Sequence, residues 1–165
     1  MNKILCVILF VFCSFTFAED AACPNHADHQ AQVDQRGDHV MGFDHNKTVH
    51  HFLLKADGGV ISAAVKDPKD RESIEKIRKH FVEIATLFSR GEFSKPKEIH
   101  DRVPPGVPAM IQYRDQITYT FHETEKGGEV RIKTAHQEAK QAIHAFLRFQ
   151  IEDHHTGDSL ELHSD

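Results

Sequence analysis

The sequence predicts an α+β fold in which a four-stranded antiparallel sheet carries two helices on one face. Two observations predict it. Two Gly-Gly turns each lie between strand-like segments, and each hairpin is followed by a stretch whose apolar residues recur with helical period. Such parts assemble most simply as one sheet covered on one side. The two rounds indicate a duplicated β-β-α unit, and a chance alignment of two hairpin-helix segments is the alternative.

Residues 1–18 have the features of a secretory signal peptide. Lys3 precedes an almost unbroken apolar run over residues 4–12, and residues 16–18 (Thr-Phe-Ala) offer small residues at the two positions that a signal peptidase inspects. A retained anchor is the alternative reading, but nothing later approaches the roughly 20 apolar residues that a membrane-spanning helix needs. We therefore expect an exported protein, periplasmic or secreted, with no membrane span in the mature chain.

Cleavage after Ala18 would leave 147 of the 165 residues, enough for one domain with its own core. Residues 19–48 contain few apolar side chains, so we expect a histidine-containing arm that is extended or loosely draped. The domain is predicted over 49–157, followed by a tail over 158–165. Loss of Lys3 moves the formal charge from −5 to −6, which argues against a nucleic-acid partner. Cys23 would be the one remaining cysteine, so no intramolecular disulfide is expected.

The first β-β-α unit is predicted from its turn and its periodicity. Strands over 50–55 and 60–66 flank a turn at 56–59. Asp67-Pro68 ends the second strand and starts a helix that runs to about Ser89. One face of this helix carries Ile74, Ile77, Phe81, Ile84 and Phe88.

The second unit follows residues 91–108, which hold four prolines and two glycines and are expected to be a connector. Residues 111–123 are strand-like, 126–128 form a turn, 130–134 a strand and 135 to about 153 a helix. Aligning Gly58-Gly59 with Gly127-Gly128 places Phe52 on Phe121 and Ile61 on Val130.

Strand alternation assigns directions to the adjacent histidines of the sequence Asp-His-Asn-Lys-Thr-Val-His-His-Phe. If Phe52 faces the helices, His50 faces them too, and His51 points to the open side of the sheet. The pair would then straddle the sheet and not bind one ion from one face. The open face would carry His51, Leu53, Thr120 and His122.

Two further histidines flank the apolar stripes of the helices, namely His80 and His144. We therefore expect His50, His80 and His144 to converge between the sheet and the helices, as in a metal or haem site. Each could equally be a hydrogen-bonded packing residue. Met41 is a possible thioether ligand near His45, although docking of Met-Gly-Phe onto the domain is the simpler interpretation.

The number of histidines, 14, also favours metal binding. Neutral imidazole binds copper, zinc and iron, and carboxylates such as Asp44, Asp101 and Asp153 can orient a ring through its other nitrogen. Binding should weaken below the ordinary histidine pKa of about 6.5. The expected cofactor is copper, zinc or iron, or haem. The predicted metal ligands are His45, His50, His51, His80, His100, His144 and His154.

Several stretches resemble a known set of proteins. They are residues 36–43 (RGDHVMGF), 47–52 (KTVHHF), 104–106 (PPG), 144–151 (HAFLRFQI), 153–154 (DH) and 156–158 (TGD). Together they resemble an uncharacterised family of small exported bacterial proteins with RGDxxMGF, KTxHHF and HxFLRFQI motifs. The resemblance covers nearly all of the mature chain and implies a single-domain export product, but it assigns no chemistry.

We therefore expect an exported, histidine-rich protein that binds a transition metal or haem, in metal handling or as a redox or sensory module. Two other classes stay open: a partner- or ligand-binding module that uses the open sheet face, as in a homodimer, and a metal-dependent enzyme. The sequence contains no phosphate loop, covalent-haem motif, metalloprotease motif or nucleophile elbow, and no catalytic residue is predicted.

Overall fold

The computed structural model describes residues 24–163. The predicted signal peptide and Cys23 lie outside this range. The elements in chain order are α1 (Pro24–Met41), η1 (His45–Lys47), β1 (Thr48–Lys55), β2 (Gly58–Val65), α2 (Arg71–Ser89), α3 (Ser94–His100), α4 (Val107–Gln112), η2 (Arg114–Gln116), β3 (Thr118–Thr124), β4 (Gly127–Lys133) and α5 (Gln137–Asp153).

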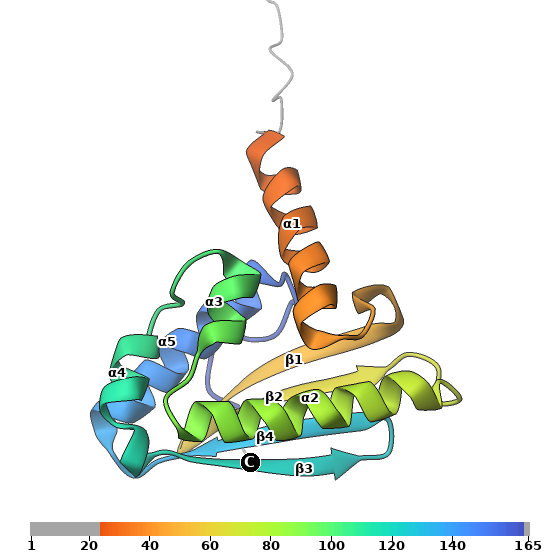
Figure 1. The fold of residues 1–165 in the computed structure, drawn as a ribbon. Helices are drawn as coiled ribbons and strands as arrows, with labels where there is room; N and C mark the ends of the chain where they lie inside the picture. The colour runs from red at the N-terminus through yellow and green to blue at the C-terminus, as the bar shows by residue number, and fades with distance from the viewer. Residues whose placement is uncertain (1–23, 164–165) are drawn as a thin grey trace, which may run out of the picture.

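The four strands form one antiparallel sheet in the order β1-β2-β4-β3 (Figure 1). The two hairpins have the same register, because Lys55 pairs with Gly58 and Thr124 pairs with Gly127. The equivalent residues Ile61 and Val130 face each other where the hairpins meet. The predicted α+β class and antiparallel sheet are confirmed, and the strand order is consistent with two hairpin units.

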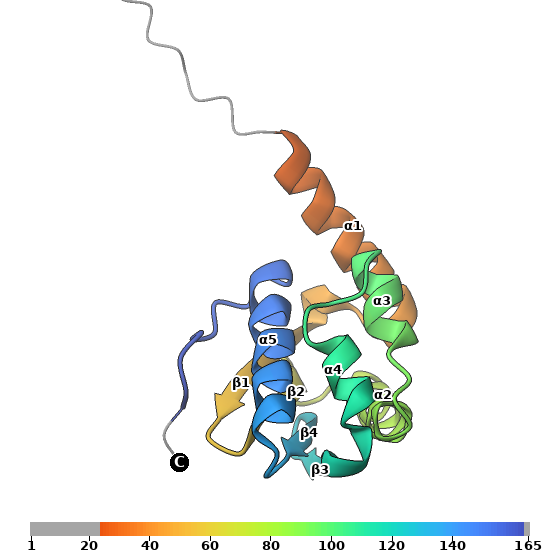
Figure 2. The ribbon, with the colours of Figure 1, turned by 90° about the vertical axis from the view of Figure 1, so that its left-hand side faces the viewer.

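The helices cover one face of the sheet. α2 packs on β3 and β4, and α5 packs on β1 and β2 (Figure 2). The close approach needs glycine at Gly59, where an added Cβ would lie 2.1 Å from Leu147 Cδ1. Among residues 24–163 no helix lies over the opposite face. The side chains that fill the layer between sheet and helices include Leu54, Ile74, Ile77, Phe81, Phe88, Val130, Ile132, Ile143, Phe146 and Leu147.

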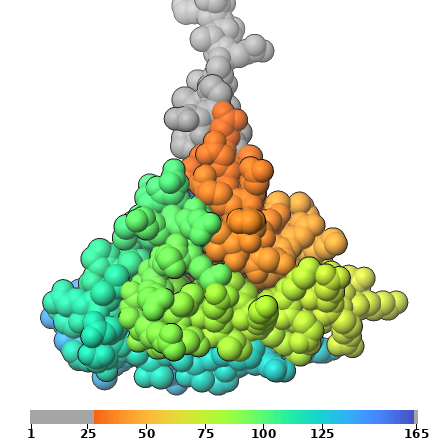
Figure 3. All heavy atoms as spheres, viewed as in Figure 1, coloured from red at the N-terminus to blue at the C-terminus, as the bar shows by residue number. Residues whose placement is uncertain are grey.

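The expectation of an extended or draped arm is wrong for residues 24–41, which form α1. Val33, Gly37 and Met41 are spaced by four residues, lie on one helix face and are buried. Arg36 Nε donates a hydrogen bond to the carbonyl of Ile99, which ties α1 to α3. In Figure 3 this part of α1 leans against α3. These three small or apolar residues on one face are enough for α1 to pack against its neighbour.

The connector prediction is also wrong in part, because residues 91–108 contain α3 and the start of α4. Pro96 and Pro108 lie in the first turns of these helices, where a missing N–H breaks no helical hydrogen bond. The strand predicted from residue 111 begins only at Thr118, and the residues before it belong to α4 and η2. Within residues 24–163, no helix is long and apolar enough to cross a membrane.

Candidate metal site

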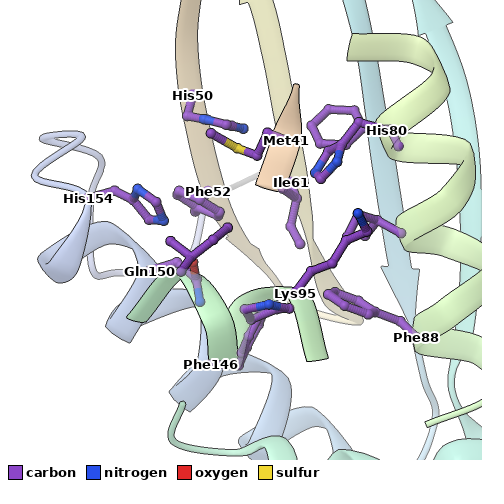
Figure 4. Close-up of a pocket in the computed structure, with 14 residues that line it drawn as sticks. Met41, His50, Phe52, Ile61, His80, Phe88, Lys95, Phe146, Gln150 and His154 are labelled. Carbon is purple, nitrogen blue, oxygen red and sulfur yellow. The ribbon is translucent and has the colours of Figure 1, made fainter. Parts of the chain in front are cut away.

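One hollow lies between α1, β1 and the end of α5, and a second adjoins it between the sheet and α2, α3 and α5. The outer one, here the histidine groove, has a volume of about 350 Å³, and the inner one, here the inner cavity, about 50 Å³. Met41, His50 and His154 line both hollows, and Figure 4 shows them around the inner cavity. The groove is also lined by Asp34, His45, His51 and His155. The cavity is otherwise mostly apolar, with His80, Lys95 and Gln150 in its wall.

His50 and His154 approach each other where the hollows meet. Their ring centres are 6.1 Å apart, and Phe52 stacks against both rings at 5.8 and 5.7 Å. His50 points to the helix side of the sheet, as alternation predicted, because it pairs with buried Ala63. Among the described residues, neither ring makes a hydrogen bond. The lone pair of each neutral ring is therefore not used by a hydrogen bond within the described residues.

The electrostatics keep these rings neutral. Burial disfavours the charged form and lowers the pKa of His50 to about 4, and the neighbouring His51 adds to the effect. Burial likewise lowers the pKa of His154 to about 3. A neutral ring has a lone pair on one nitrogen, so both residues are in the form that binds a metal at neutral pH.

His80 reaches the inner cavity from α2. It is 7% exposed, lies edge-on to Phe43 with ring centres 5.7 Å apart, and has its pKa lowered to about 3 by burial. It does not line the histidine groove. His80 therefore lies in the wall of the cavity, across from His50 and His154 in Figure 4.

His45 and His51 approach the groove with one nitrogen already fixed. His45 Nδ1 lies 2.9 Å from Asp38 Oδ2, and His51 Nδ1 lies 2.8 Å from Asp158 Oδ1. An ionised carboxylate only accepts hydrogen bonds, so Nδ1 donates in each of these two pairs. This is the arrangement that usually orients a metal-ligating histidine. His45 Nε2 is 3.9 Å from Asp34 Oδ2.

The segment that follows α5 packs beside β1 and helps to explain why His50 and His51 line the same groove. β1 is an edge strand, and the segment after α5 passes along its free edge. The backbone N–H of Phe52 donates to Asp158 Oδ2 at 2.9 Å, and Leu54 O accepts from the N–H of His163. His50 and His51 point to opposite faces, as predicted, but both border a groove that follows the strand's edge.

One compact set of metal-binding residue types also occurs at the groove's margin. Side-chain ligand atoms of Asp38, Asp44 and His45 all lie within 4.8 Å of one another, the one set of three His, Cys, Asp or Glu residues of this kind in residues 24–163. Asp44 also accepts a hydrogen bond from the N–H of Asn46 and starts η1. These residues form a possible His/Asp metal-binding cluster.

Two of the predicted ligands are held elsewhere. His144 Nε2 lies 2.9 and 3.0 Å from the carbonyls of Lys55 and Gly58, at the tip of the first hairpin. It lines neither hollow, so the expected convergence of His50, His80 and His144 is wrong for His144. The rotation of α5 about its own axis sets the direction of this side chain. The apolar residues of the helix do not fix that rotation to within one residue.

His100 is buried at the end of α3 and is fully hydrogen-bonded. Its Nδ1 lies 2.6 Å from Asp153 Oδ2 and its Nε2 lies 3.0 Å from Gln150 Oε1. Burial lowers the pKa of His100, while these two hydrogen bonds oppose that shift. Burial alone would raise the pKa of Asp153, but hydrogen bonds from His100 and His29 bring it below its ordinary value. His100 thus supports α5 from behind and offers no free nitrogen.

The structure gathers His45, His50, His51, His80 and His154 of the predicted ligands around the two hollows. Sequence reasoning missed Asp34, Gln150 and His155. The stretches 36–43, 47–52, 153–154 and 156–158 all contribute to the groove or to the residues behind it, but none of them contains Asp34, Gln150 or His155.

No family model, curated protein or solved structure matches this chain. The resemblance to an exported bacterial family therefore stays a prediction. The same holds for haem as a cofactor and for the open sheet face as a dimer surface.

Proposed function

We propose that this protein binds a transition-metal ion in the histidine groove, with His50 and His154 as the central ligands and a role in metal handling outside the cytoplasm. The observation that carries the proposal is the pair of neutral imidazoles that border one hollow without any hydrogen bond among the described residues. Both rings are partly buried and line the groove, so an ion in the groove can reach them.

The spacing of the two rings supports a shared ion. Imidazole nitrogen binds zinc at about 2.0–2.1 Å, so two rings that approach one ion from opposite sides have centres roughly 6 Å apart. The ring centres of His50 and His154 are 6.1 Å apart before any ion is added.

The neighbouring groups favour copper. Met41 lines both hollows with the two histidines, and its thioether is a soft ligand that suits copper(I). His45 and His51 line the same groove, and one ring nitrogen of each is held by Asp38 and by Asp158.

The test is a metal titration of untagged protein stripped with a chelator. Copper(II) and zinc(II) are added, and free metal is measured by equilibrium dialysis with elemental analysis. We expect one tightly bound ion in the parent protein. Affinity should fall at least about tenfold in His50→Ala and in His154→Ala, since each removes a direct ligand.

His144→Ala and His122→Ala are the matched controls, because His144 is bonded to backbone carbonyls away from the groove and His122 lies on the open face of the sheet. Both controls should bind like the parent. Binding unchanged in His50→Ala and His154→Ala, with folding intact by circular dichroism, would contradict the proposal.

A further inference from the structure

The sheet has two edge strands, and the segment after α5 covers one of them. β1 and β3 are the outer strands of the order β1-β2-β4-β3. The backbone N–H of Phe52 in β1 donates to Asp158, and the carbonyl of Leu54 accepts from the N–H of His163. In Figure 2 this segment lies beside β1, on the far side of the sheet from β3.

The register of β3 shows which of its backbone groups point outward. Thr124 and Gly127 flank a two-residue turn, and residues in that position exchange both hydrogen bonds of an antiparallel pair. Bonding alternates along the strand. The backbone N–H and C=O groups of Tyr119, Phe121 and Glu123 therefore point away from β4.

The first hairpin supports this assignment. It has the same register, and Phe52 and Leu54, which bond to the segment after α5, are the equivalents of Phe121 and Glu123. Among residues 24–163, no further backbone hydrogen bond reaches the outward groups of β3. Within these residues, one edge of the sheet is paired and the equivalent edge is open.

β3 lacks the features that usually protect an exposed edge strand. Protected edges are very short, are bulged, or carry Pro or Lys. β3 has seven residues, pairs with β4 without a bulge, and contains neither Pro nor Lys. Its one charged residue, Glu123, lies near the end of the strand, 3.4 Å from Arg78 of α2. Such an edge favours pairing with another strand.

The flank of α2 beside this edge exposes an apolar side chain. Arg78 donates a hydrogen bond to the carbonyl of Thr124, at the end of β3. Val82 lies one turn later on the same flank and is 49% exposed. His80, on the other flank, lines the inner cavity. Val82 is therefore turned away from the cavity and towards the side of the open edge.

We infer that β3 and α2 form the interface of a homodimer, in which the β3 strands of two copies pair antiparallel about a two-fold axis at Phe121. This register overlaps all seven residues of β3 and joins two four-stranded sheets into one. Tyr119 then faces Glu123 of the second copy, and Thr120 faces His122. Like charges do not oppose each other in this arrangement, which would otherwise destabilise the pairing.

The same axis brings the two copies of α2 together. Neighbouring strands lie about 4.8 Å apart and α2 lies over β3 and β4, so the two helix axes would be roughly 10–14 Å apart. Phe88 contacts Tyr119 and Arg78 contacts Thr124, so the middle of β3 lies under the stretch of α2 that contains Val82. Burial of Val82 would add apolar area to the backbone hydrogen bonds of the paired strands.

The first test measures the molar mass of the metal-free mature chain by light scattering over a range of concentrations. We expect the parent to form a dimer. Val82→Asp brings two carboxylates near the axis, so it should raise the Kd of the dimer at least about tenfold. Val103→Asp is the matched control, because Val103 is 52% exposed in the connector between α3 and α4. It should dimerise like the parent.

Disulfide trapping tests the register. In the proposed pairing, Thr120 of one copy and His122 of the other are non-hydrogen-bonded neighbours with Cα atoms about 4.5 Å apart, a distance that a disulfide can span. Thr120→Cys and His122→Cys proteins, each also carrying Cys23→Ser, are mixed, oxidised with glutathione disulfide and analysed by intact mass. We expect the mixed disulfide to exceed either self-disulfide.

A parent that stays monomeric at every concentration would overturn the inference. A dimer that Val82→Asp leaves intact would overturn it too, because the two copies would then meet at another surface. Self-disulfides as abundant as the mixed one would refute the register at Phe121. The protein is metal-free throughout, so each of these outcomes is independent of the proposed metal site.

Discussion

Acid should destabilise this protein more steeply than its net charge suggests, because the folded protein holds His50, His80 and His154 as neutral rings. Their folded-state pKa values are about 4, 3 and 3, against about 6.5 in an unfolded chain. As the pH falls below 6.5 the unfolded chain binds protons first. The stability that is present above pH 6.5 is therefore lost as the pH falls toward the folded-state values.

The magnitude follows from the linkage relation. Each pH unit below 6.5 costs about 1.36 kcal/mol per histidine, so at pH 5 each of the three removes about 2 kcal/mol and together about 6 kcal/mol. His50 and His154 keep some contact with solvent, so this sum is an upper limit. A domain of this size has a free energy of unfolding of about 5–15 kcal/mol, so protonation of these histidines could remove a large part of its stability at pH 5.

The assay is urea unfolding followed by circular dichroism at several pH values between about 7 and 5, with a chelator present to exclude metals. His80→Leu removes one buried titrating ring, so its stability should fall with pH about one third less steeply than that of the parent. His122→Ala, on the open sheet face, is the control and should follow the parent. A urea midpoint that is constant from about pH 7 to 5, or equal slopes in His80→Leu and the parent, would refute the reasoning.

Three further substitutions test the packing, each by urea unfolding at neutral pH. Phe81 is 1% exposed, so Phe81→Ala should destabilise by about 3–5 kcal/mol; an unchanged midpoint would remove it from the core. Gly106 has a φ of +84° and an added Cβ would lie 2.1 Å from Ala142 O, so Gly106→Ala should shift α4 from α5 and cost more than about 1 kcal/mol. The carboxylate of Asp70 caps α2 by accepting a hydrogen bond from the backbone N–H of Ser73, so Asp70→Ala should lower the free energy of unfolding by about 0.5–2 kcal/mol. An unchanged free energy of unfolding would show that the cap does not stabilise the protein.

The sheet and its two covering helices were predictable because their signals are local and repeated. Two-residue turns beside Gly58 and Gly127 set the register, and α2 has an apolar face long enough to specify its period. α1 was missed because few apolar residues mark it and its stability depends on contact with α3. α3 and α4 were missed because Pro96 and Pro108 were interpreted as breakers when they lie in first helical turns.

The candidate site was predictable to the extent that it depends on strand alternation. The direction of His50 follows from the period of β1, whereas the position of His154 depends on how the chain turns after α5. His144 illustrates the limit of this prediction. A rotation of α5 by one residue determines whether its side chain points to the cavity or to the carbonyls at the hairpin tip, where the structure places it. Gln150 carried no sequence signal, because its hydrogen bond with His100 depends on how α3 packs beside α5.

The low pKa values change the expected pH dependence of metal binding. The sequence predicts weaker binding below pH 6.5, but protons compete for His50 and His154 only near pH 4 and 3, so acid should release the ion by unfolding the protein. A metal at 100 times its Kd stabilises the folded state by about 2.7 kcal/mol. Three buried histidines lower stability by about 4 kcal/mol per pH unit, so the acid unfolding midpoint should fall by about 0.7 pH units with metal present. His50→Ala should remove most of this shift, and a parent midpoint that is the same with and without copper would contradict it.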